Sequence, residues 1–66
     1  MQIKVNDNVI SVEPSCPVSR LLHTLSVTVQ GTALAVNERI IPASEWSDYR
    51  LQENDDVVIF QVIAGG

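Results

Sequence analysis

The sequence contains few of the residues that usually supply cross-links or catalysis. It has one cysteine, one histidine, and one each of Phe, Trp and Tyr in 66 residues. Because Cys16 has no second cysteine to pair with, nothing indicates an oxidising compartment. We expect no signal peptide before the first predicted strand, and no apolar run approaches the ~20 residues that cross a membrane as a helix. We therefore expect a cytoplasmic protein with no membrane association.

Basic residues are scarce as well. Four lysines and arginines stand against eight aspartates and glutamates, which gives a net charge of −4. Nucleic-acid binding is not expected, because no basic cluster is present to neutralise phosphates, whereas a basic protein partner would suit this charge. A chain of 66 residues, 45% of them hydrophobic, makes one small domain. Such a domain has little room for a deep pocket, which argues against a self-contained enzyme.

Alternating polar and apolar residues predict an N-terminal hairpin. The strands are expected at residues 2–5 and 9–13, joined by the turn-forming cluster at residues 6–8. The side chains expected to be buried are Ile3, Val5, Ile10 and Val12.

A helix follows the hairpin. Pro17 is expected at the first helical position, where its missing N–H costs nothing. The β-branched run at 27–29 and then Gly31 predict an end near Ser26. Four apolar residues recur at the helical spacing and form one stripe: Val18, Leu21, Leu22 and Leu25.

The second half of the sequence predicts further strands. Residues 33–36 and 40–41 are expected as short strands, 43–46 as a helical turn, and Arg50 as part of a very short strand. The apolar run at 57–63 is expected as a central last strand. The predicted fold class is therefore α+β, with one helix packed against a mostly antiparallel sheet of four or five strands.

The last strand is apolar on both faces. If Val57 and Ile59 face the helix, the opposite face carries three apolar side chains that the helix cannot cover: Val58, Phe60 and Val62. An exposed patch of this kind would mark a protein-binding surface. The alternative is that the loop around Trp46 and Tyr49 folds over these side chains.

Few side chains are candidates for chemistry. His23 is expected on the solvated side of the helix, and Cys16 is expected to be a packing residue, with a reactive thiol at the helix start as the alternative. The acidic turn of Glu53, Asp55 and Asp56 lacks the ligand spacing and the glycine of a calcium loop, so we expect a solvated turn, with contact to a basic partner as the alternative. We therefore expect no metal site and no bound cofactor.

The C-terminal residues are the exception. After the last strand come Ala64, Gly65 and Gly66, and none of them has a side chain larger than a methyl group. Glycine adopts almost any backbone conformation. We therefore expect a folded body at residues 1–63 and a flexible tail at 64–66, in which Gly65 gives clearance and Gly66 presents its carboxylate to a partner.

Several segments resemble the bacterial thiamine-biosynthesis sulfur carrier family (ThiS). They are 34–37 (Leu-Ala-Val-Asn), 40–42 (Ile-Ile-Pro), Trp46, 54–55 (Asn-Asp) and the ending 60–66. The resemblance spans the whole chain. It departs from the family's pattern at Asn54, usually a glycine, and at Pro17, where a threonine-like cap is common.

The resemblance implies a ubiquitin-like β-grasp fold with a mixed sheet, and a role as a protein co-substrate. A partner adenylyltransferase related to ubiquitin-activating enzymes would use ATP and magnesium to adenylate the Gly66 carboxylate. A cysteine desulfurase system would then supply sulfur, leaving a thiocarboxylate that thiazole synthase accepts. Partner contacts are expected from Val58, Phe60, Val62 and Ala64.

Three alternatives stay open. The first is a carrier like the molybdopterin-synthase small subunit, which uses the same tail chemistry. The second is a ubiquitin-like modifier that forms isopeptide bonds to lysines. The third is a β-grasp interaction module in which the glycine ending is incidental.

Overall fold

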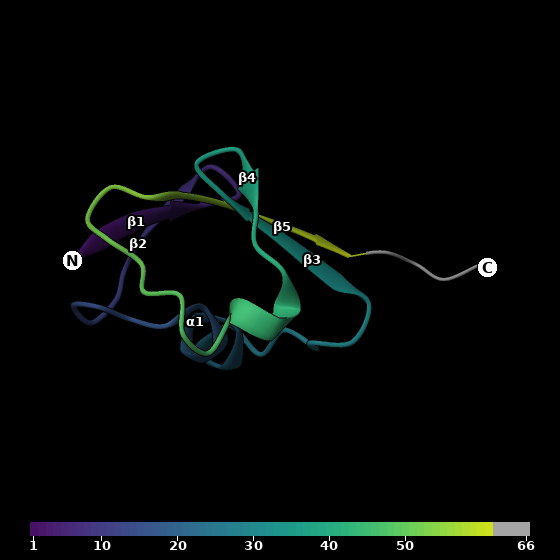
Figure 1. Cartoon of the computed structure of the whole chain (residues 1–66). Coiled ribbons are helices and arrows are strands. Elements are labelled where there is room, and N and C mark those ends of the chain that lie inside the picture. The colour runs from purple at the N-terminus through teal and green to yellow at the C-terminus, as the bar shows by residue number, and fades with distance from the viewer. Residues whose placement is uncertain (62–66) are drawn as a thin grey trace.

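A computed structural model describes residues 1–61 of the chain, and these residues form one sheet packed on one α-helix (Figure 1). The strands lie in the order β2-β1-β5-β3-β4, with β5 in the centre; β1 and β5 are parallel and the other pairs are antiparallel. The elements are β1 (Gln2–Val5), β2 (Asn8–Ser11), α1 (Val18–Thr24), β3 (Thr32–Val36), β4 (Arg39–Ile40), the 3₁₀ turn η1 (Ala43–Glu45) and β5 (Asp56–Gln61). The predicted class, the mixed sheet and the central last strand are confirmed.

Two tight turns close the hairpins β1-β2 and β3-β4. Each has two central residues, Asn6–Asp7 and Asn37–Glu38, and all four have φ between 48° and 71°. Positive φ at both positions is the type I′ geometry that matches the twist of paired strands, and asparagine tolerates it better than most residues. Strand β2 is shorter than the predicted 9–13, because its four residues already pair with all four of β1.

Helix α1 begins one residue later and ends earlier than expected. Pro17 is not the first helical residue: its backbone is extended (φ −69°, ψ 150°), and it forms an isolated bridge with Arg50. This bridge is all that forms of the very short strand predicted around Arg50. The helix ends at Thr24, and Ser26 already has a φ of 58°. Leu25 is consequently 37% exposed and contributes little to the apolar stripe.

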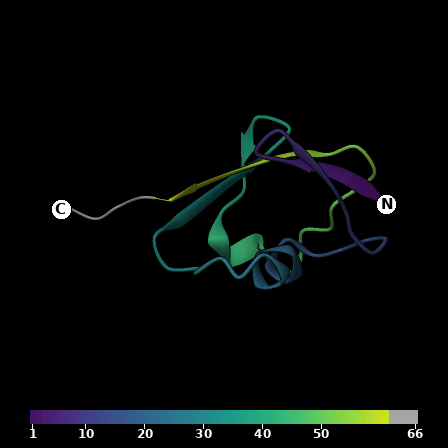
Figure 2. The same ribbon diagram turned by 180° about the vertical axis from the view of Figure 1, so that it is seen from behind.

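The hydrophobic core lies between α1 and one face of the sheet. Val18, Leu21 and Leu22 of the helix are fully buried against core residues of the strands. The loop that contains η1 lies beside α1 on this same side of the sheet (Figures 1 and 2). Trp46 is 4% exposed within this core and donates a 2.8 Å hydrogen bond from Nε1 to the carbonyl oxygen of Ile41. The alternative that this loop covers the opposite face of the sheet is therefore wrong.

Candidate functional site

Strand β5 directs its side chains alternately to the core and to the face of the sheet opposite α1, here called the open face. Val57 is fully buried and Ile59 packs against the core. Val58 is half-buried outside that core cluster, and Phe60 is 45% exposed. The predicted division of β5 is thus confirmed for these residues. The other predicted site residues, namely Val62, Ala64, Gly65 and Gly66, lie outside the described residues.

Neighbouring strands extend this apolar surface. The register places Ala33 opposite Phe60 and Ala35 opposite Val58, and Ile40 of β4 lies opposite Ala35. Ile40 is 60% exposed, whereas Ala35 is only 6% exposed because longer side chains flank it on both sides. We call the set the open-face patch: Ala33, Ala35, Ile40, Val58 and Phe60. The face on which Ile40 lies could not be predicted from the sequence, because a two-residue strand has too few residues to show an alternation.

The other half of the open face, here called the polar half, carries charged side chains beside one exposed valine. Lys4 lies between Val9 on β2 and Asp56 at the start of β5. The open-face patch is therefore confined to the part of the sheet nearest the end of β5, and charged side chains lie toward its start. This arrangement, an apolar area with a charged border, is typical of a protein-binding surface.

The acidic turn before β5 is partly a structural element. Asp55 is only 9% exposed, so the expectation that it is solvated is wrong. Its Oδ1 accepts a 2.9 Å hydrogen bond from Asn37 Nδ2, and its Oδ2 accepts a 2.8 Å bond from the backbone N–H of Gln52. Asn37 Oδ1 in turn accepts the N–H of Asp56 at 3.0 Å. The carboxylate thus fastens the start of β5 to the β3-β4 turn.

Cys16 is a packing residue. It is 3% exposed within the core, as the sequence analysis expected. Burial raises the pKa of its thiol, the charge of Glu13 raises it further, and Arg20 partly offsets both. A buried thiol that holds its proton is a poor nucleophile. His23 lies exposed on α1, also as expected.

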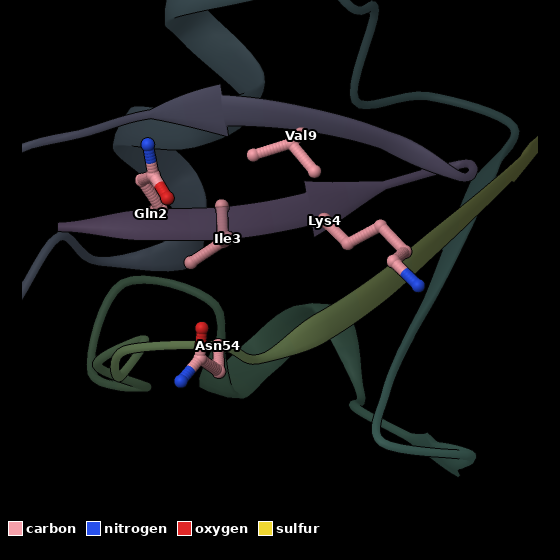
Figure 3. Close-up of a pocket in the computed structure, with 5 residues that line it drawn as sticks. All are labelled: Gln2, Ile3, Lys4, Val9 and Asn54. Carbon is pink, nitrogen blue, oxygen red and sulfur yellow. The ribbon is translucent and has the colours of Figure 1, made fainter.

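A shallow pocket of about 270 Å³ lies at the opposite end of the sheet from the end of β5 (Figure 3). Its lining combines β1 and β2 with the turn before β5, through Gln2, Ile3, Lys4, Val9 and Asn54. In residues 1–61, no three His, Cys, Asp or Glu side chains are grouped closely enough to hold a metal ion. In the same span, no helix is both long and apolar enough to cross a bilayer.

Comparison with known proteins relates the whole chain to one family. The sulfur carrier protein ThiS of Escherichia coli (strain K12) is 39% identical over 66 residues, which are 100% of both chains. A crystal structure of the thiamine biosynthesis protein ThiS from Geobacter metallireducens matches over 100% of both chains with a TM-score of 0.88 at 22% identity. A solution structure of a thiamine biosynthesis protein from that organism covers 100% of this chain and 88% of its own, with a TM-score of 0.77 at 20% identity. These structures share the β-grasp fold described above. Because residues 1–66 also match the ThiS family as a whole, the chain belongs to that family.

Proposed function

We propose that this protein is a sulfur carrier for thiamine biosynthesis and that the carboxylate of Gly66 carries the sulfur. The observation that supports this most is the 39% identity to the E. coli sulfur carrier over 100% of both chains, an alignment that includes Gly65 and Gly66. The position of β5 agrees with it. The strand that precedes the glycines lies at the centre of the sheet, and five residues beyond Gln61, fully extended, span at most about 17 Å.

The proposed chemistry needs an activated carboxylate, because a carboxylate is a poor electrophile at neutral pH. An oxygen of the Gly66 carboxylate attacks the α-phosphorus of ATP in a partner adenylyltransferase, and pyrophosphate leaves. A persulfide sulfur, supplied by a cysteine desulfurase system, then attacks the acyl carbon and displaces AMP. A second thiol attacks the resulting acyl disulfide, which releases the thiocarboxylate on Gly66 and oxidises the two thiols to a disulfide. Thiazole synthase is the proposed acceptor of this sulfur.

In this proposal the folded body supplies recognition and the partners supply catalysis. The open-face patch is apolar, lies on β5 and its neighbours, and sits nearest the end of the strand that continues to Gly66. A partner that covers Val58 and Phe60 would therefore hold the start of the C-terminal segment next to its nucleotide site. The net charge of −4 favours a partner surface that carries basic residues around an apolar centre.

Mass spectrometry of the protein recovered from thiamine-starved cells tests the proposal. We expect a species in which one oxygen is replaced by sulfur. Deletion of Gly66 should abolish this species. Substitution of Lys4, whose side chain lies on the polar half of the open face, should leave it unchanged. A truncated chain that still gains sulfur would contradict the assignment to Gly66. Covalent adducts on lysines of other proteins would favour a ubiquitin-like modifier instead. Sulfur loading that supports molybdopterin and not thiazole formation would favour the molybdopterin-synthase type of carrier.

A further inference from the structure

The hydrogen bonds between β1 and β5 do not end where the two strands stop pairing. The last paired residues are Val5 and Val57, and the N–H of Asn6 donates to the carbonyl oxygen of Val57 at 2.9 Å. At Asn6 the backbone then turns toward β2 with a φ of 48°. A continuing parallel ladder would next need an acceptor for the N–H of Ile59 and a donor for its carbonyl oxygen.

The side-chain amide of Asn6 supplies both groups. Its Oδ1 accepts the N–H of Ile59 at 2.9 Å, and its Nδ2 donates to the carbonyl oxygen of Ile59 at 3.4 Å. The first distance is typical of a good hydrogen bond, whereas the second is long, so the bond to Oδ1 contributes most. The amide therefore replaces the backbone groups of the departing strand and adds one further position to the ladder.

This added position coincides with the open-face patch. Ile59 lies between Val58 and Phe60, two residues before the end of β5, and on its other edge β5 pairs with β3 as far as Gln61. We propose that Asn6 is a positioning residue, whose side-chain amide holds the end of β5 so that the open-face patch is ordered before a partner binds. Its effect on sulfur loading rests on the function proposed above, whereas its effect on the strand does not.

The test compares three glycine variants, each at a position with positive φ, so that the backbone of each turn is kept. Asn6→Gly removes the amide that bonds Ile59. Asn37→Gly removes an equivalent turn amide at the start of β5, where it bonds Asp55 and Asp56. Asp7→Gly changes the same turn as Asn6, at a side chain that makes no hydrogen bond within residues 1–61.

Amide hydrogen exchange gives the first measurement. Asn6→Gly should lower the protection of the Ile59 N–H by about fivefold more than that of core amides such as Leu34, which corresponds to one net hydrogen bond. Asn37→Gly and Asp7→Gly should lower the protection of the Ile59 N–H only as much as they lower that of the Leu34 N–H. If the Ile59 and Leu34 amides lose protection equally in Asn6→Gly as well, the proposal is wrong, whatever the protein's function.

Steady-state adenylation gives the second measurement, with ATP, magnesium and the adenylyltransferase of the same organism. A strand end that is ordered in only part of the molecules raises the apparent KM in inverse proportion to that part and leaves kcat unchanged. We expect KM to rise about two- to fivefold for Asn6→Gly, with partial recovery in Asn6→Asp, which keeps an acceptor for Ile59. An equal rise of the KM in Asn37→Gly would show that Asn6 only stabilises the fold, and would overturn the positioning role. Absence of adenylation of the unmodified chain would contradict the proposed function and leave the exchange result standing.

Discussion

At the residue scale, Asp55 shows a carboxylate that serves the fold and not a ligand. Both of its oxygens accept hydrogen bonds at 2.8–2.9 Å, and it is 9% exposed. Asp55→Ala would leave the Asn37 amide and the Gln52 N–H without these acceptors. We expect the free energy of unfolding, measured by urea denaturation, to fall by about 1–3 kcal/mol.

Glu53 provides the control for this prediction, because it lies in the same turn but is exposed. Its Oε2 accepts the N–H of Gln2 at 2.8 Å. Water can replace an exposed acceptor, so Glu53→Ala should lower the free energy of unfolding by less than about 1 kcal/mol. Equal losses for the two variants would show that burial of Asp55 contributes nothing to its effect.

Residues of this kind explain what sequence reasoning misses. Asn37 is 18 positions from Asp55, and Asn6 is 53 positions from Ile59. Neither spacing leaves a periodic signal, since the partners meet only through the topology of the sheet. Residue type alone predicts that the asparagines form turns and that Asp55 is solvated. The backbone at the asparagines does turn, but the side chain of Asp55 is buried and hydrogen-bonded.

At the element scale, β5 joins the two functions of the sheet, because one face closes the core and the other forms the open-face patch. Phe60→Asp should raise the KM for adenylation about tenfold or more, since the docked partner would lose the burial of an aromatic ring. The circular dichroism spectrum should be unchanged, because Phe60 is 45% exposed and outside the core.

Val9→Asp is the matched control for Phe60→Asp. Val9 is 64% exposed and lies on β2 beside Lys4, in the polar half of the open face. The Val9→Asp variant should leave the KM for adenylation unchanged. If both variants raised the KM alike, added negative charge and not the open-face patch would be responsible.

Elements were predicted better than their ends. The stripe of α1 and the alternation of β1 and β5 follow from spacing that the sequence contains. The start of α1 could not be read in this way, because a bridge to Arg50, far along the chain, holds Pro17 extended. The length of β2 likewise depends on the length of β1, because all four residues of β1 are already paired with β2. Of the five residues in the open-face patch, Val58 and Phe60 were predicted, whereas the place of Ile40 follows only from the register between β3 and β4.

At the scale of the whole molecule, Cys16 couples the stability of the fold to pH. Burial raises the pKa of its thiol in the folded state. As the pH rises, the unfolded chain therefore loses this proton first. The contribution of Cys16 to stability is complete below the ordinary thiol pKa of 9.0 and is lost as the pH rises from there through the higher pKa of the folded state. We expect the urea midpoint to fall between pH 8 and pH 10 by more in the unmodified protein than in Cys16→Ala. A parallel fall in both would assign the pH dependence to other groups.

The pairing of β1 with β5 also determines how the molecule bears mechanical load. The two strands are parallel and adjacent, and the chain enters at the start of β1 and continues from the end of β5. A pull on Gln61 directed away from Met1 therefore slides one strand along the other and strains their hydrogen bonds together, with the Asn6 amide among the first to be loaded. An antiparallel pair opened from one end would break one bond at a time. The folded body is thus built to resist a pull on the end of β5 along that direction.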